Sequence, residues 1–338
     1  MSVNKKILEV KNLRVYFNTK KGVSKAVDGN DFTMYENETL AIVGESGCGK
    51  SVTAMSILGL VGNPGKIMED SQIMYMGDVE RDEEGIDLSK CSDKQIRDVR
   101  GNGISMIFQE PMTSLNPVYT VGAQITENIH LHEDVKKEEA EARAIELLKT
   151  VGISRPEKIF KNYPYQLSGG MCQRVMIAMA LSCSPKLLIA DEPTTALDVT
   201  IQAQILSLMN ELKEKTGTSI MLITHDLGVV AQVADYVNVM YAGKVVETAA
   251  VDELFENPKH PYTIGLMKSM PSLATEGTRL ATIEGNVPNP LYLPKGCYFA
   301  DRCEKAMPKC RESQPGKVKI KSRHHVSCFL YDETGSDQ

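Results

Sequence analysis

The sequence predicts an α/β fold with a parallel sheet, followed by a smaller C-terminal domain. Short apolar segments bounded by glycine, proline or polar residues recur along the chain, which is typical of buried parallel strands. Segments with the apolar spacing of amphipathic helices lie between them, and this alternation indicates a sheet covered by helices. Prolines become frequent after residue 256, so a second domain is expected to begin near residue 250. A chain of 338 residues, 42% of them hydrophobic, is long enough for both cores.

The individual elements follow from these patterns. The strands expected in the main sheet are residues 39–43, 104–108, 186–190 and 219–224, and the expected helices are residues 51–60, 136–151 and 202–215. Residues 7–17 and 26–35 alternate in hydrophobicity like an antiparallel layer, which residues 73–76 are expected to join. Residues 80–100 are rich in charge and are expected to form an exposed connection. No long helix is expected beyond residue 270.

Composition restricts the possible partners and location. The formal net charge is −6 and the sequence pI is about 5.7, so the chain lacks the basic field that nucleic-acid binding usually needs. No apolar run approaches the roughly 20 residues that a membrane-spanning helix requires. The N-terminus carries two lysines but no apolar stretch of signal-peptide length, so a cytoplasmic location is expected.

The clearest motif is a glycine-rich loop, GESGCGKS, at residues 44–51. It matches the P-loop pattern G-x-x-x-x-G-K-[ST] and lies between an expected strand and an expected helix, a context that makes a chance glycine-rich turn the weaker alternative. Such loops point backbone N–H groups and a helix N-terminus at phosphates, while the lysine reaches the β- and γ-phosphates and the following hydroxyl binds Mg²⁺. The residues expected to bind ATP here are Gly44, Glu45, Ser46, Gly47, Cys48, Gly49, Lys50, Ser51 and Val52, with Ser51 on the metal and Cys48 at a variable position.

A second motif, KLLIADE at residues 186–192, is an apolar strand that ends in two acids. Carboxylates at the carboxyl end of a parallel strand lie at the rim where open α/β sheets bind ligands. Taken alone, this ending is more often an ordinary capped strand. Downstream of a P-loop it predicts that Asp191 holds Mg²⁺ and that Glu192 orients or deprotonates the attacking water.

Residues 167–173, LSGGMCQ, resemble the signature motif of ABC-type ATPases. The other motifs of that family follow in order, and the resemblance extends from residue 7 to about 250. Gln109 in MIFQEP resembles the Q-loop, residues 196–198 in TTALD the D-loop with Asp198, and His225 in LITHD the switch histidine. Phe17, with Tyr16 as second choice, stands where the family has an adenine-stacking aromatic. The implied fold is a P-loop NTPase ABC-ATPase domain with a RecA-like core, an antiparallel β layer and a helical subdomain at about residues 112–168.

The resemblance also implies a shared active site. Two ATPase domains are expected to face head to tail, so that Ser168, Gly169 and Gly170 of one form a second phosphate cradle for nucleotide on the other. The implied catalytic residues are Glu192, His225 at the γ-phosphate, and Gln109, which links Mg²⁺ and water to the membrane subunits. One departure is Cys172, which stands where the family commonly has a basic residue.

The C-terminal part resembles the extension on ATPases of the dipeptide, oligopeptide and nickel importer subfamily. The segments that carry the resemblance are NPKHPYTIGLMKSMP at residues 257–271, IEGNVPNP at residues 283–290, and GCYFADRCEKAMPKC at residues 296–310. The expected division is an ATPase domain at residues 1–250 and an oligopeptide-transporter-type domain at residues 251–338. Within the latter, His260, Pro261 and Tyr262 are expected to fix a turn rather than to perform chemistry.

Four cysteines crowd into the C-terminal part, at positions 297, 303, 310 and 328. The C-x₂₋₄-C spacing typical of zinc knuckles is absent from them. Their wider spacing favours a [4Fe–4S] cluster held by Cys297, Cys303, Cys310 and Cys328, as in the subfamily that this region resembles. Zinc, including a mixed site with His324 and His325, and free or disulfide-bonded cysteines stay open as alternatives.

The expected function is that of the ATP-hydrolysing subunit of a dipeptide or oligopeptide importer, peripheral at the cytoplasmic face of the cell membrane, with nickel import as the alternative. The implied partners are a second ATPase subunit, expected to be a paralogue, two transmembrane permease subunits and an extracytoplasmic peptide-binding protein, and no nucleic acid. DNA-repair ABC ATPases carry long coiled-coil insertions, whereas 117 residues separate Lys50 from Ser168 here. Translation factors carry two cassettes. A binding module without turnover is disfavoured by Glu192 and His225.

Overall fold

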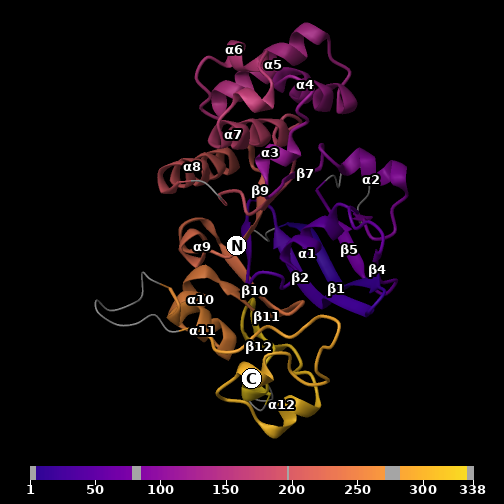
Figure 1. Cartoon of the computed structure of the whole chain (residues 1–338), viewed down its shortest axis with the longest axis vertical. Coiled ribbons are helices and arrows are strands. Elements are labelled where there is room, and N and C mark those ends of the chain that lie inside the picture. The colour runs from indigo at the N-terminus through magenta and orange to yellow at the C-terminus, as the bar shows by residue number, and fades with distance from the viewer. Residues whose placement is uncertain (1–4, 78–84, 196–197, 271–281, 333–338) are drawn as a thin grey trace.

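The computed structural model describes residues 5–77, 85–195, 198–270 and 282–332. Within them the main sheet has eight strands in the order β12-β13-β11-β10-β3-β9-β8-β7 (Figure 1). Five neighbouring strands run parallel: β10 (Tyr236–Tyr241), β3 (Thr39–Val43), β9 (Ser219–Thr224), β8 (Leu187–Asp191) and β7 (Ile104–Ile107). The four segments predicted as parallel strands are therefore confirmed. Their apolar side chains are buried on both faces of the sheet.

A second, antiparallel sheet contains the N-terminal strands. It comprises β1 (Lys6–Thr19), β2 (Gly22–Tyr35), β4 (Gly65–Ile67), β5 (Gln72–Tyr75) and β6 (Ile86–Asp87). The predicted antiparallel layer is thus confirmed, including the strand near residue 73. Helix α1 (Lys50–Ile57) contacts both β1 and β2, and one continuous core joins this layer to the main sheet.

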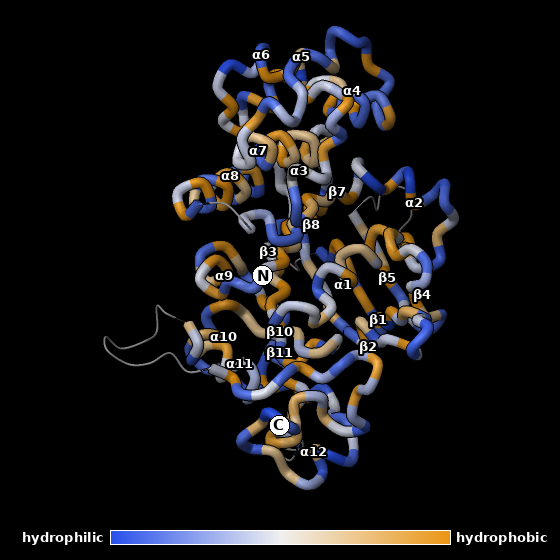
Figure 2. The backbone as a smooth tube through the Cα atoms, viewed as in Figure 1, coloured by the Kyte–Doolittle hydropathy of each residue, from blue (hydrophilic) through white to orange (hydrophobic). Residues whose placement is uncertain are grey.

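Helices gather at one end of the molecule, beyond β7 and β8 (Figure 1). They are α3 (Pro111–Ser114), α4 (Val121–His132), α5 (Lys137–Thr150), α6 (Pro156–Phe160), α7 (Gly169–Ala180) and α8 (Val199–Thr216). Helix α7 is hydrophobic along most of its length (Figure 2), and its buried residues belong to a core shared with β8 and β9. Packing between α7 and the sheet therefore fixes where the signature segment lies.

The prediction of an exposed connection at residues 80–100 was wrong for the part that the structure describes. Residues 86–87 form β6, and α2 (Asp93–Val99) follows. Ser92 caps α2 and exchanges hydrogen bonds with Gln95, while Ile96 and Val99 are buried in the core. The signal was present in the sequence, because S-x-x-Q is a capping box and apolar residues three apart share one helix face. Residues 80–84 lie outside the described residues.

The C-terminal region is joined to the main sheet. After β11 (Lys244–Ala250) come α10 (Val251–Glu256), α11 (Pro261–Lys268), α12 (Pro308–Glu312), β12 (Val318–Lys321) and β13 (His324–Val326). Strand β13 pairs antiparallel with β11, so the C-terminal hairpin extends the ATPase sheet. The rings of Tyr241, Tyr262 and Phe299 pack against one another at tilted and edge-to-face angles in a core shared by both regions.

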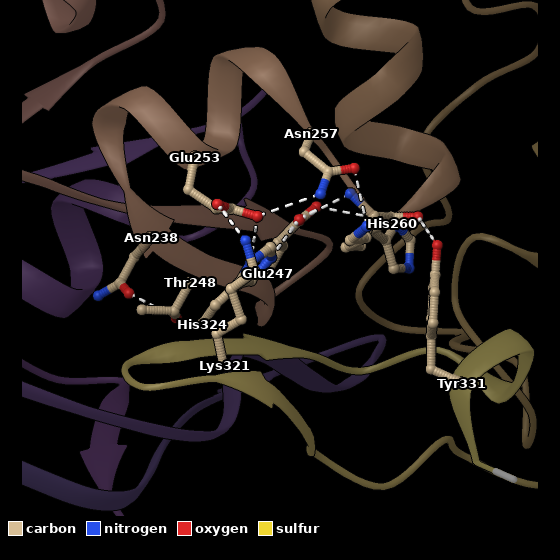
Figure 3. Close-up of polar contacts among 10 residues, drawn as sticks. Asn238, Glu247, Thr248, Glu253, Asn257, His260, Lys321, His324 and Tyr331 are labelled. Carbon is tan, nitrogen blue, oxygen red and sulfur yellow. Dashed lines mark hydrogen bonds and ion pairs between the residues drawn. The ribbon is translucent and has the colours of Figure 1, made fainter. Parts of the chain in front are cut away.

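A buried carboxylate ties this hairpin to the preceding helices (Figure 3). Glu247 on β11 accepts a hydrogen bond from His324 Nε2 at 3.0 Å, and its oxygens also accept the backbone N–H groups of Lys259 and His260, each at 2.8 Å. The Glu247 and His324 side chains are almost completely buried. Because a buried polar group is stable only when it is hydrogen-bonded, this network holds the hairpin in place.

Candidate nucleotide-binding site

The glycine-rich loop connects the central strand β3 to helix α1, as the sequence predicts. Gly49 has a φ of 99°, and a Cβ there would lie 2.3 Å from the carbonyl oxygen of Ala26, so only glycine fits this close approach. Lys50 is 5% exposed and its ammonium donates to the carbonyl oxygens of Gly44 at 2.8 Å and Glu45 at 3.2 Å. Ser46 and Gly47 are exposed, whereas Cys48 is buried in the core. The Lys50 ammonium is therefore buried, whereas the turn at Ser46 and Gly47 is open to solvent.

Asp191, the last residue of β8, lies next to Ser51. Asp191 is 4% exposed, and its Oδ1 atom has no hydrogen-bond partner among the described residues. Burial raises the pKa of Asp191, and a hydrogen bond from Ser51 opposes that effect. A buried carboxylate oxygen without a partner, beside a hydroxyl, is the hard oxygen donor set that Mg²⁺ prefers. These two residues therefore fit the predicted metal position.

Glu192 is the centre of a polar cluster that contains all three predicted catalytic residues. Its carboxylate accepts hydrogen bonds from Gln109 Nε2 at 3.0 Å and Thr195 Oγ1 at 2.8 Å, and His225 Nδ1 lies 3.3 Å from the other oxygen. Desolvation favours the protonated form, but the hydrogen bonds of Thr195 and His225 outweigh it and lower the pKa of Glu192. The carboxylate is therefore ionised at neutral pH and able to accept a proton from water.

Backbone geometry also marks this position. Glu192 has a φ of 47°, a conformation that non-glycine residues rarely adopt and that concentrates at functional sites. Gln109 contacts Glu192 rather than Ser51 or Asp191 in the described part of the chain, so its predicted metal contact stays a prediction. Thr195 is a site residue that the sequence analysis missed. Its position three residues after Glu192, across the turn that this φ creates, was the available signal.

The signature segment lies at the start of α7. The Ser168 side chain caps the helix by accepting the N–H of Met171 at 3.4 Å, and Ser168 and Gly169 are exposed to solvent. A Cβ on Gly169 would meet no atom within 4 Å. Cys172, the departure from the family pattern, is fully buried in the helical core. The chain therefore presents an exposed helix N-terminus, which suits the binding of an anion held by another subunit.

The remaining predicted nucleotide contacts are in the D-loop and at the end of β1. Asp198 is described and caps α8 through the N–H of Ile201 at 3.0 Å, whereas residues 196–197 lie outside the described residues. Phe17 is half-buried at the end of β1 and packs partly on the core. The Tyr16 hydroxyl instead donates to Asp28 at 2.5 Å. Phe17 stays the predicted adenine contact, because Tyr16 is engaged elsewhere.

The four C-terminal cysteines converge. Cys297, Cys303, Cys310 and Cys328 all line one small pocket, and all four are free thiols. Burial raises the pKa of Cys328 to about 11, and the three neighbouring thiols add to the effect. No group of three or more His, Cys, Asp or Glu side chains in the described ranges is arranged to hold a single metal ion. His324 is bonded to Glu247, and neither His324 nor His325 lines the pocket of the four cysteines, so the residues as placed do not form the mixed zinc site.

Comparisons with known proteins agree with this geometry. The chain matches the family model described as ABC transporter over residues 27–195 and the model described as oligopeptide/dipeptide transporter, C-terminal region, over residues 246–310. It is 57% identical to the oligopeptide transport ATP-binding protein AppD of Bacillus subtilis, over 98% of this chain and 99% of AppD. It is 50% identical to the dipeptide transport ATP-binding protein DppD of Bacillus subtilis, over 97% and 96% of the two chains.

Solved structures with the same fold are also ABC cassettes. The dimeric ATP-binding cassette MJ0796 bound to ADP and Pi superposes with a TM-score of 0.64 at 26% identity, covering 72% of this chain and 99% of that one. The protein cbiO1 from Clostridium perfringens, part of the ABC transporter complex cbiONQ, gives a TM-score of 0.60 at 28% identity, with 75% and 92% covered. The chain therefore belongs to the ABC transporter ATPases, in the family of oligopeptide and dipeptide transport ATP-binding proteins.

Proposed function

We propose that this chain binds and hydrolyses ATP to energise the uptake of dipeptides or oligopeptides through an ABC importer. The observation that carries the proposal is the Glu192 cluster, in which an ionised carboxylate meets Gln109, Thr195 and His225 beside the buried Asp191. The relatives above carry oligopeptide or dipeptide names, which favours peptides over nickel. No helix of the described segments is long and apolar enough to cross a membrane.

The proposed roles follow from these positions. Residues 44–52 cradle the phosphates, with Lys50 on the β- and γ-phosphates and Phe17 on the adenine. Ser51 and Asp191 would hold Mg²⁺, which supplies positive charge to the phosphates when it is bound. Gln109 would link the metal and the water to the loop that touches the membrane subunits. Glu192 orients or deprotonates the attacking water, and His225 contacts the γ-phosphate.

A single chain supplies only half of the proposed site. Ser168, Gly169 and Gly170, together with Asp198, would close over nucleotide bound to a second ATPase subunit, which we infer to be a paralogue. Such an ATP-dependent interface converts binding and hydrolysis into a conformational change, because ATP favours the closed pair. The other inferred partners are two transmembrane permease subunits and an extracytoplasmic peptide-binding protein. The chain would then lie at the cytoplasmic face of the membrane.

Reconstitution of the complete importer in vesicles tests this proposal. Peptide-loaded binding protein is expected to stimulate ATP hydrolysis and to drive peptide into the vesicles, whereas nickel with the same components is expected to do neither. Isolation of the intact complex, with identification of the ligand on its binding protein, gives an independent answer. Uptake of nickel without peptide uptake would move the assignment to the alternative substrate.

The shared site makes a prediction for Gly169→Ala. Because a Cβ at Gly169 has free space within this chain, the variant should fold and bind ATP like the natural protein. In the closed pair the methyl group would intrude between the signature N–H groups and the partner's phosphates, so ATPase activity of the complex should fall roughly 10- to 100-fold. Steady-state ATPase assays and melting curves measure both quantities.

Gly62→Ala is the matched control for that experiment. A Cβ at Gly62 also meets nothing within 4 Å, and this glycine belongs to none of the proposed phosphate cradles. Its activity should equal that of the natural protein. Full ATPase activity of a correctly assembled Gly169→Ala complex would refute the two-subunit site while leaving the P-loop assignment intact.

We also propose that the four C-terminal cysteines hold a [4Fe–4S] cluster with a structural role. The convergence of Cys297, Cys303, Cys310 and Cys328 on one pocket supports it. The pocket has a volume of about 20 Å³, roughly the space of one water molecule, so the four cysteines would have to move apart to admit a cluster. Protein isolated without oxygen should be brown, with iron and acid-labile sulfide near four each per chain. Zinc at about one ion per chain would contradict the cluster.

The division into residues 1–250 and 251–338, with a helical subdomain at about 112–168, is likewise a proposal. The family model for the C-terminal region begins at residue 246, which supports a boundary nearby. The pairing of β13 with β11 means that the two parts share a sheet, so we expect them to unfold together. A single cooperative transition in calorimetry is the expected observation.

A further inference from the structure

The C-terminal region reaches the P-loop through one arginine. Arg302 donates from Nη1 to Glu45 Oε2 at 2.7 Å and from Nη2 to Glu45 Oε1 at 3.0 Å, a two-pronged pairing of guanidinium and carboxylate. The Arg302 side chain is 6% exposed, and that of Glu45 is 29% exposed. Paired bonds of this kind fix orientation as well as distance, and partial burial protects them from screening by salt. The contact joins residues that are 257 positions apart.

Arg302 is itself held rigidly on its other side. Its Nε donates to the carbonyl oxygen of Glu284 at 3.0 Å, and Nη2 donates to that of Ile283 at 3.1 Å. Nη1 also reaches the Tyr241 hydroxyl at 3.3 Å, on strand β10 of the main sheet. A guanidinium with so many fixed acceptors has few alternative rotamers. It therefore acts as a rigid support for Glu45.

A second C-terminal residue holds the same loop position. The backbone N–H of Glu45 donates to the hydroxyl of Tyr262 at 2.9 Å, and Tyr262 is fully buried against Tyr241 and Phe299. The carbonyl oxygen of Glu45 in turn accepts from Lys50. The carboxylate, N–H and carbonyl of Glu45 are thus all engaged, two of them by residues beyond position 250.

We propose that Arg302 is a positioning residue for ATP binding, which holds Glu45 and thereby the P-loop in the conformation that receives the phosphates. The inference rests on the proposed function and assigns part of the ATP site to the C-terminal region. Next to Glu45, Ser46 and Gly47 are exposed and receive little packing, so the pairing supplies a fixed point for this part of the loop. A loop ordered before ligand arrives loses less conformational entropy on binding, and its affinity is correspondingly higher. Arg302 also directly precedes Cys303, so the turn that carries the thiol also carries this support.

Arg302→Met and its control test the inference in the full-length chain. Met keeps the length and apolar stem of the side chain but cannot bridge to Glu45. The expected result is a rise in the ATP dissociation constant of about tenfold, with a matching rise in KM and little change in kcat. Arg311→Met is the control, because Arg311 lies in the same region and pairs with Asp301 on the surface, away from the P-loop. Its ATP affinity should equal that of the natural chain.

Glu45→Gln removes the negative charge and one of the two acceptors of the same pairing from the P-loop side, without a change in the C-terminal core. It should weaken ATP binding by a similar factor, and the double variant should be no weaker than either single one, because both remove one interaction. Melting temperatures recorded without nucleotide separate folding from binding. Arg302→Lys, which restores one charged donor, should recover part of the affinity.

The outcomes separate this inference from the proposed function. If the natural chain does not bind ATP, the proposed function fails and the inference fails with it. If the natural chain binds ATP but Arg302→Met and Glu45→Gln bind it equally well, only the inference is overturned. A lower melting temperature with unchanged ATP affinity would mean that Arg302 only tethers the C-terminal region, and would overturn the inference too. Weaker ATP binding by both variants, without additivity, supports it.

Discussion

Replacement of Glu192 by glutamine is expected to lower the rate of ATP hydrolysis by roughly 100-fold or more, with ATP binding retained. The carboxylate is ionised, since its hydrogen-bonded neighbours lower its pKa, and it can therefore accept a proton from the attacking water. A neutral amide of the same size cannot. Its oxygen still accepts the Thr195 hydroxyl, so the cluster should keep its shape. Phosphate release under saturating ATP measures the rate, and equilibrium binding of ATP measures the affinity.

Glu211→Gln is a suitable control for this change. Glu211 is exposed on α8, where it pairs with Lys215 at 3.6 Å and accepts a hydrogen bond from Ser207 at 3.5 Å. Both contacts lie on the surface, so its replacement should leave turnover unaltered. In the Glu192→Gln variant, trapped ATP should also prolong the association of the two ATPase subunits. If Glu192→Gln hydrolyses ATP as fast as the natural protein, Glu192 is not a catalytic residue. The assignment of the ATP-binding residues would still stand.

Replacement of Lys50 by methionine is expected to weaken ATP binding by roughly 100-fold, because a charged hydrogen-bond donor to phosphate is lost. The ammonium is buried and held by the Gly44 and Glu45 carbonyl oxygens, poised beneath the loop. Methionine occupies similar space without the charge, so the fold should persist. A ligand that binds only the folded state raises the melting temperature, and this MgATP-induced rise should largely vanish.

Lys66→Met provides the comparison for that loss. Lys66 lies on β4 and pairs with Glu69 on the surface at 3.3 Å, and both side chains are well exposed. The Lys66→Met variant should show the full MgATP-induced rise in melting temperature. An undiminished rise in Lys50→Met would show that nucleotide binds elsewhere, and would contradict the P-loop assignment together with everything built on it.

Sequence patterns predicted four of the five parallel strands of the main sheet, and missed β10 and the antiparallel strands beyond it. The bounds of β3 and β9 coincide with the predicted residues 39–43 and 219–224, because a strand buried on both faces is an uninterrupted apolar run between polar ends. Helix α2 was missed because the charges around it suggested a loop, although its buried face needs only Ile96 and Val99. The C-terminal hairpin was missed because β12 has four residues and β13 has three, too few for an alternating pattern to stand out from a loop.

The sequence by itself determined the chemistry of this protein. The residue types and spacings of the P-loop, of Asp191 with Glu192, and of LSGGM encode local backbone shapes and donor sets that do not depend on distant parts of the chain. Tertiary structure alone decided which side chains support them: Thr195 across the Glu192 turn, and Arg302 and Tyr262 on Glu45 from more than 200 residues away. Local propensity acts over a few residues, whereas these contacts exist only after the sheet and the C-terminal core have packed together.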